Sequence, residues 1–166
     1  DTGEYRNEPL IFEGTGLVQN MTIISTYDDV ENPNVSDLVA YAVHVDDRQN
    51  LAGKKQTFIN CVMSSNGSAA IGIGLHQDET VELINCELYS HTPSTSSSSI
   101  NGALLCHSGS GANITGQKLL VKDCIIHSDY NKAVSITDAL NTGGGEMEVT
   151  FINNMAYCNA KGTTDI

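Results

Sequence analysis

The sequence predicts an all-β solenoid of about five rungs, and three observations support this prediction. An eight-residue motif built around Asn or Asp returns five times along the 166 residues, always in the same register. A second, strand-like motif that begins with Ala precedes four of the five copies. The chain between motifs varies in length, whereas the motifs do not. Repeats of this kind are typical of solenoids, in which each rung buries its face against its neighbours.

The first motif combines two strand-like halves whose apolar positions are out of step. The five copies are Val18–Ser25, Phe58–Ser65, Leu83–Ser90, Val121–Ser128 and Phe151–Cys158. The apolar residue before the Asn or Asp lies two positions away, but those after it lie one and three positions on, as at Cys61 and Met63. A bend keeps both halves facing the core, and Asn and Asp tolerate the left-handed conformation that a bend needs. We therefore expect one column of bends, at Asn20, Asn60, Asn85, Asp123 and Asn153.

The second motif supplies a further strand to each rung. Its copies are Ala42–Asp46, Ala70–Gly74, Ala103–His107 and Ala133–Thr137, each with apolar residues at the second and fourth positions. The Ala lies 18, 15, 20 and 20 residues before the next Asn or Asp. One rung is therefore a short strand, a turn of variable length, a strand, a bend and a strand.

Three short strands per rung with a polar residue at the bend resemble the pectin-lyase-like family, and the resemblance covers residues 10–160. It implies a right-handed, single-stranded parallel β-helix of about five rungs. Ala42–Val45 through Phe58–Cys61 is also similar to one rung of pectin methylesterases. The catalytic pattern of those esterases is not matched here. Tyr41 stands where they carry Gln, and Gln77–Thr80 falls on a turn. The resemblance implies the fold and not that activity.

Composition narrows the class of partner. The net charge is −12 with only 8 Lys and Arg, which argues against binding nucleic acid or an anionic membrane surface. No apolar run approaches the length of a membrane span, so we expect no membrane insertion. We assign residues 1–13, polar and containing Pro9, to an N-terminal arm or linker, and residues 14–166 to one β-helix domain. Solenoids need covered ends, so we expect a segment of something larger or one partner in an oligomer that covers the open ends and edges.

The five cysteines predict buried thiols. Cys61, Cys86 and Cys124 share one inward position, so they should stack in neighbouring rungs, where disulfide geometry is poor. No CxxC or HxxxH spacing supports zinc, so we expect no metal and no cofactor. Free buried thiols favour assembly in a reducing cytoplasm, even for a protein that works outside the cell.

Alternation along the Ala-led strands gives the candidate binding residues. His44, Asp46, His107 and Thr137 should point outward, and His76 follows one of these strands. Such a row could bind sugar rings, although the ordinary solvated face of a solenoid would look the same. Tyr27, Tyr41, Tyr89 and Tyr130 are further possible sugar contacts.

The candidate catalytic residues are carboxylates near the ends of the same strands. They are Asp46, Asp47, Asp78, Glu79 and Asp138. Glycoside hydrolysis needs two carboxylates about 5–10 Å apart, which adjacent rungs could supply, as could many acidic surfaces.

Two classes of function follow. In the first, the chain resembles a non-catalytic β-helix module of a bacteriophage tail spike, fibre or appendage that binds a bacterial surface polysaccharide or serves as a structural segment. The resemblance implies a virion or extracellular location and a homotrimer or larger virion assembly. In the second, the chain is part of a polysaccharide-degrading hydrolase or lyase with its carboxylates on the outward sheet face. A purely structural spacer is a third hypothesis.

Overall fold

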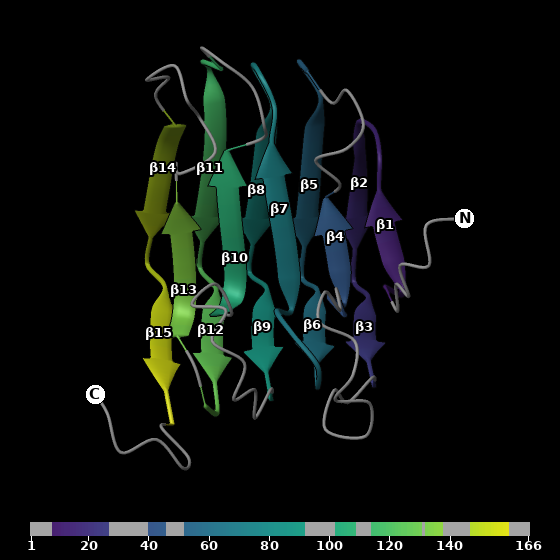
Figure 1. Cartoon of the computed structure of the whole chain (residues 1–166), viewed down its shortest axis with the longest axis vertical. Helices are drawn as coiled ribbons and strands as arrows, with labels where there is room; N and C mark the ends of the chain where they lie inside the picture. Colours follow the sequence, from purple (N-terminus) through teal and green to yellow (C-terminus); the bar gives the residue numbers. More distant parts are fainter. Residues whose placement is uncertain are drawn as a thin grey trace, which may run out of the picture.

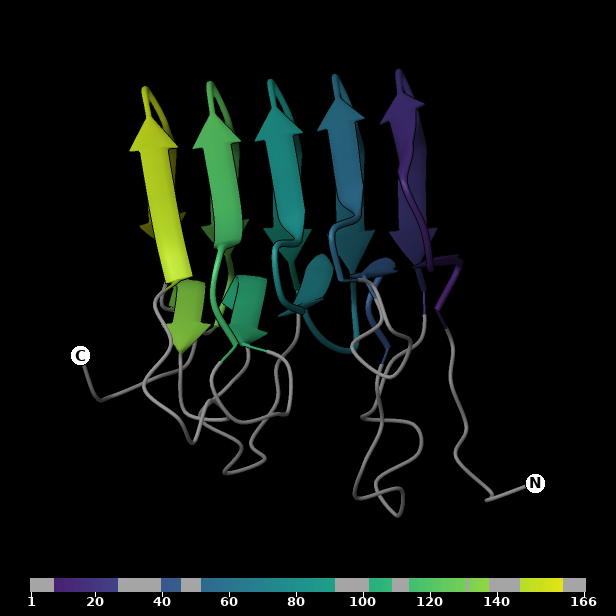
Figure 2. The same cartoon turned by 90° about the horizontal axis from the view of Figure 1, so that it is seen from above.

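The computed structural model describes residues 8–26, 40–45, 52–91, 102–108, 114–130, 132–137 and 147–159. In this part of the chain all regular structure is β-strand, arranged in three parallel sheets of five strands each (Figure 1). Each sheet takes one strand from each rung, and the five rungs stack side by side (Figure 2). The predicted all-β parallel β-helix of about five rungs is therefore confirmed.

The strands of each sheet are three apart in chain order. The first sheet contains β1 Leu10–Phe12, β4 Val43–Val45, β7 Ile71–Leu75, β10 Gly102–Ser108 and β13 Lys132–Thr137. The second contains β2 Gly16–Gln19, β5 Lys55–Ile59, β8 Thr80–Ile84, β11 Gln117–Lys122 and β14 Met147–Ile152. The third contains β3 Thr22–Ser25, β6 Val62–Ser65, β9 Glu87–Ser90, β12 Ile125–Ser128 and β15 Met155–Cys158.

The first strand lies inside the segment that we assigned to an N-terminal arm. β1 pairs in parallel with β4 over Leu10–Phe12 and completes the first rung. Three residues after Pro9 are too few to show a strand period, so the sequence pattern did not reveal this strand.

The bends between the second and third sheets form the predicted column. The φ angles are 57° at Asn20, 54° at Asn60, 51° at Asn85, 56° at Asp123 and 53° at Asn153. Side chains link the column, since the Nδ2 of Asn60 donates to Asn20 Oδ1 at 3.1 Å and that of Asn85 to Asn60 Oδ1 at 2.8 Å. The Nδ2 of Asn153 donates to Asp123 Oδ1 at 2.7 Å. Asn or Asp thus provides both the backbone conformation and the contact between rungs.

A second left-handed column marks the corner between the first and second sheets. Gly53, Asp78 and Gly116 have φ angles of 69°, 55° and 72° and precede β5, β8 and β11. The backbone N–H of Gly53 donates to Gln77 O at 2.9 Å, and that of Asp78 to Thr115 O at 2.9 Å. Glycine suits the positive φ at Gly116, and a Cβ there would also displace the Asp78 carboxylate.

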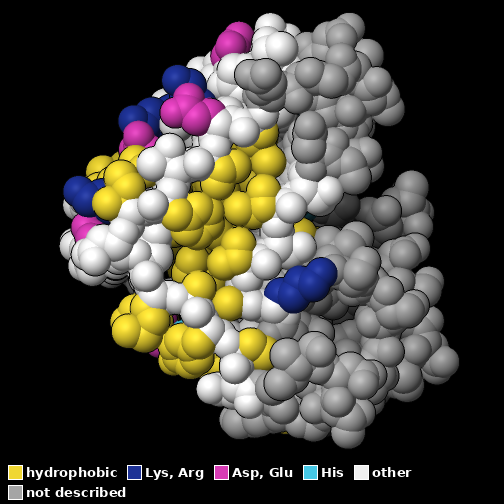
Figure 3. Space-filling model, turned by 90° about the vertical axis from the view of Figure 1, so that its left-hand side faces the viewer, with side chains coloured by type: hydrophobic (Ala, Val, Ile, Leu, Met, Phe, Trp, Pro, Cys, Tyr) yellow, Lys and Arg dark blue, Asp and Glu magenta, His cyan; other side chains and the backbone are white. Residues whose placement is uncertain are grey.

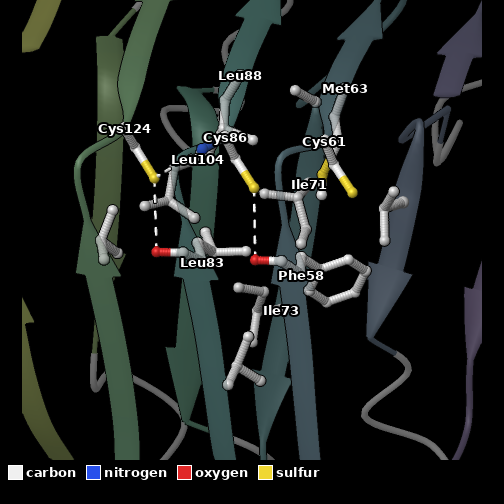
Figure 4. Packing of buried hydrophobic residues seen from close by; sticks show 14 of the residues in the cluster. Phe58, Cys61, Met63, Ile71, Ile73, Leu83, Cys86, Leu88, Leu104 and Cys124 are labelled. Atoms are coloured by element: carbon white, nitrogen blue, oxygen red, sulfur yellow. Dashed lines mark hydrogen bonds between the residues drawn. The ribbon is translucent and has the colours of Figure 1, made fainter. Parts of the chain in front are cut away.

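The core lies between the three sheets and is filled by stacked apolar side chains (Figure 4). Phe58, Leu83 and Leu104 are fully buried. The Sγ of Cys86 lies 3.5 Å from Phe58 O, and the Sγ of Cys124 lies 3.5 Å from Leu83 O. All five cysteines are free thiols, and four of them, Cys61, Cys86, Cys106 and Cys124, are buried as small hydrophobic residues.

Candidate functional site

The outward face of the first sheet is covered at His44, one of the predicted sugar contacts. His44 is only 7% exposed, and its neighbour in the same row, Leu105, is 2% exposed. The Nδ1 of His44 lies 2.8 Å from the Glu8 carboxylate, and the Tyr41 ring meets the His44 ring edge-on at 5.2 Å. His44 therefore lies against a buried carboxylate and under an aromatic ring.

The other predicted contacts lie apart from His44. Strand register places His44 opposite Gly72 but His107 opposite Gly74 and Thr137, one row further along the sheet. The Nδ1 of His107 donates to Ser108 O at 2.9 Å, since a carbonyl can only accept. His76 lies just beyond β7, and its buried Nε2 has no hydrogen-bond partner within the described part of the chain. Asp46, Asp47, Asp138 and Tyr27 lie outside the described residues.

The two described catalytic candidates are adjacent in sequence but occupy opposite environments. Asp78 is an exposed corner residue whose left-handed backbone is shared with glycines in neighbouring rungs. Glu79 is fully buried, and its Oε2 accepts a hydrogen bond from the His76 backbone N–H at 2.7 Å. They do not share a face, so they do not make a pair of carboxylates across one substrate.

Glu79 lies in a polar pocket of the interior. The Gln56 and Gln117 side chains are also fully buried, and their amides donate to the backbone carbonyls of Gly14 and Leu75. Burial raises the pKa of Glu79 to about 7, against weaker opposing effects of hydrogen bonds from His76 and Gln56. The carboxyl is therefore partly protonated near neutrality, which eases its burial.

The third sheet carries a different cluster on its outward face. Tyr89, His127 and Tyr157 occupy the same outward position on β9, β12 and β15. The Tyr89 and His127 rings stack at 4.4 Å and the His127 and Tyr157 rings at 5.2 Å, both within 13° of parallel. The His127 Nε2 also lies 3.1 Å from Glu87 Oε1. Because these rings cover one another, the ladder leaves chiefly ring edges and polar atoms for an outside molecule.

Asp129 organises the polar part of this cluster. Its side chain is only 2% exposed, and its Oδ2 accepts from Tyr89 OH at 2.7 Å and lies 2.6 Å from His91 Nδ1. Its Oδ1 accepts from Asn159 Nδ2 at 2.7 Å. The carboxylate fixes Nδ1 of His91 as a donor, so Nε2 is the ring nitrogen left for another molecule. The His91 side chain is 45% exposed, and Tyr130 meets it edge-on at 5.8 Å.

Tyr89 acts in this cluster as a hydrogen-bond donor and not as a base. Burial is the larger cause and the hydrogen bond to Asp129 the smaller one, and together they raise the pKa of Tyr89 to about 12. The phenol therefore stays protonated at neutral pH. Of this cluster, the sequence analysis named only Tyr89 and Tyr130. Applying the alternation rule to the third strand would have found His127 and Tyr157, whereas His91 and Asp129 follow strands and give no such signal.

Comparisons with known proteins give this chain no relative. No family model matches it, and neither the curated proteins nor the solved structures contain a match. In the described part of the chain, no group of three or more His, Cys, Asp or Glu side chains is arranged to hold a metal ion. No helix long and apolar enough to cross a membrane occurs among the same residues. The structure therefore defines the fold class of this chain, a parallel β-helix.

Proposed function

We propose that this chain is a non-catalytic β-helix module of a bacteriophage tail spike, fibre or appendage, and that it binds bacterial surface carbohydrate. The observation that carries the proposal is the cluster of Tyr89, His91, Asp129 and Tyr130 on the outward face of the third sheet. It joins a fixed imidazole to aromatic rings at a partly exposed site, while the row predicted on the first sheet is largely covered at His44.

The chemistry of the cluster suits a neutral sugar. An imidazole whose one nitrogen is held by a buried carboxylate presents the other to a hydroxyl group in a fixed direction. Tyr130 takes no part in the ring ladder and provides apolar surface next to His91. The net charge of −12 disfavours long anionic glycans, because their carboxylates or sulfates would be repelled.

Calorimetric titration with capsular and O-antigen polysaccharides from a panel of bacteria tests this proposal. His91→Ala and Tyr130→Ala should each weaken binding by about tenfold or more, since each removes a direct contact. Lys118→Ala, an exposed change on β11, should leave binding unchanged. His107→Ala compares the two faces. Loss of binding in His107→Ala with retention in His91→Ala would move the site to the first sheet.

A second candidate, polysaccharide cleavage, is favoured by one observation, the His91–Asp129 pair. A histidine held by a buried aspartate is an arrangement used by general bases. Incubation with the same glycans distinguishes the two functions. Release of reducing ends or of unsaturated products, abolished by His91→Ala, would support cleavage, and binding without release supports the recognition module.

A further inference from the structure

Exposed apolar side chains are concentrated at the two ends of the solenoid. Of the eleven large exposed hydrophobic residues in the described part of the chain, nine lie on the first or last rung. They are Ile11, Leu17, Met21 and Ile24 on the first rung, and Val149, Phe151, Ile152, Met155 and Tyr157 on the last. Figure 3 shows hydrophobic side chains gathered over the last rung. Solenoids that end in solvent carry polar terminal repeats, whereas the first and last described rungs expose these apolar side chains.

The last rung presents core residues that the inner rungs cover. Val149 and Phe151 are 37% and 41% exposed, whereas their register partners Leu119 and Val121 are 1% and 0% exposed. On the first rung, Met21 is 49% exposed, although Cys61, the residue that follows the next bend, is 1% exposed. The chain thus presents at both ends the kind of surface that it buries between its own rungs.

The hydrogen-bonding groups at the two ends are complementary. In each side-chain link of the bend column, the Nδ2 of the later rung donates to the Oδ1 of the earlier rung. Within this column of described residues, the Nδ2 of Asn20 on the first rung therefore has no acceptor and the Oδ1 of Asn153 on the last rung has no donor. The Oδ1 of Asn85 also lacks a donor, because its neighbour Asp123 has no Nδ2. The backbone also leaves a donor at the last rung. The Asp123 N–H donates to Ile152 O at 3.0 Å, whereas the Asn153 N–H has no such acceptor among the described residues.

We propose that these two ends bind each other in separate copies of the chain. The first rung of one copy stacks on the last rung of the next copy as a further parallel rung. In register, Phe151 lies against Val18 of the second copy, and Tyr157 lies against Ile24, so apolar side chains meet at both positions. Joining two like ends would instead oppose two Asn153 Oδ1 acceptors. Unlike ends generate an open assembly, and the stacking does not depend on carbohydrate binding.

Sedimentation velocity of the full chain over a concentration series tests the proposal. Met21→Lys blocks the first rung and Phe151→Lys the last, because each places an unpaired charge in the contact. The wild type should form dimers and larger species as concentration rises, and each variant alone should stay monomeric. Mixing the two variants should give a 1:1 dimer and nothing larger, because each retains one functional end.

The controls separate this arrangement from others. Ile125→Lys, at an exposed apolar position on β12 of an inner rung, should associate as the wild type does. Asn20→Asp replaces the spare donor by a negatively charged acceptor oxygen and should weaken association by about tenfold or more while keeping the fold, since Asp occupies the same column at position 123. A wild type that stays monomeric at every concentration, or a single variant that dimerises alone, would overturn the proposal.

Discussion

At the scale of single residues, the left-handed backbone determines where each rung turns. Six described residues other than glycine have a positive φ, and five of them form the column between the second and third sheets. Most L-residues lose about 1–2 kcal/mol in this conformation, and Asn and Asp lose less because their short side chains bond locally. In this protein the side chains also form hydrogen bonds between rungs, so both the backbone conformation and the contact between rungs favour Asn or Asp.

Asn85 tests this double role. Asn85→Leu should lower the free energy of unfolding by roughly 1–3 kcal/mol, because it strains the bend and leaves Asn60 Oδ1 without its donor. Urea denaturation followed by circular dichroism measures the change. Asn85→Gly, which keeps the conformation and loses only the link, should cost less than the leucine variant. Equal stability of Asn85→Leu and wild type would show that the bend tolerates any residue.

The buried Glu79 carboxyl makes a separate prediction about pH. Its folded pKa of about 7 lies above the ordinary value of 4.5, so the folded chain binds the proton more tightly than the unfolded chain. Its contribution to stability is fully present below pH 4.5 and is lost as the pH rises through about 7, by up to roughly 3 kcal/mol. The groups that face it are the Gln56 amide, the His76 backbone N–H and the Cys106 thiol.

Glu79→Gln isolates this contribution from the other carboxyl groups. The free energy of unfolding, measured by urea denaturation between pH 4 and 8.5, should fall more steeply with rising pH in wild type than in the variant. The difference between the two curves should grow between pH 4.5 and 7. Parallel curves for the two proteins would mean that Glu79 titrates as an exposed glutamate does.

At the scale of strands, alternation predicted the inward side chains of all three sheets but not the surroundings of the outward ones. Val43, Ile71 and Leu104 are buried in one row, as their period requires. His44 points outward, as the alternation predicts, yet Glu8 and Tyr41 pack against it. Sequence alternation tells which face a side chain takes, and it carries no information on which distant segment covers that face.

The contact between Tyr41 and Gly72 tests how the first sheet is covered. A Cβ on Gly72 would overlap the Tyr41 ring, so Gly72→Ala should destabilise by roughly 1–3 kcal/mol. In a Tyr41→Ala background the same change should cost much less, because the ring is gone. A double-mutant cycle in urea measures this coupling. Costs that are additive within about 0.5 kcal/mol would contradict the contact.

The four buried thiols and the one exposed thiol make a prediction about reactivity. Only Cys158 of the five cysteines is exposed, and burial raises the pKa of Cys106 to about 12, which suppresses its thiolate. A colorimetric thiol reagent should therefore modify one cysteine rapidly in native protein and all five in urea. Cys158→Ser should abolish the rapid phase. Rapid reaction of two or more thiols in the native protein would contradict the packing of the core.

At the scale of the whole molecule, the repeats predicted the architecture, whereas the candidate site depended on what the rungs bring together. His91 and Asp129 are 38 residues apart and meet because each follows a strand of the third sheet, in neighbouring rungs. No local motif joins them, so the pair could not be predicted from the sequence. The polar ends expected of a solenoid are also missing from the described rungs, which is why the ends themselves become candidate interfaces.

The central claim, one chain stacked in parallel rungs, is tested most directly by NMR couplings transmitted through backbone hydrogen bonds. The account predicts couplings from the amide of Asn20 to the carbonyl carbon of Ile59, from Asn60 to Ile84, from Asn85 to Lys122, and from Asp123 to Ile152. These four couplings identify donor and acceptor residue by residue. Couplings from the same amides to other carbonyls, or a pattern of antiparallel pairs, would contradict the parallel β-helix.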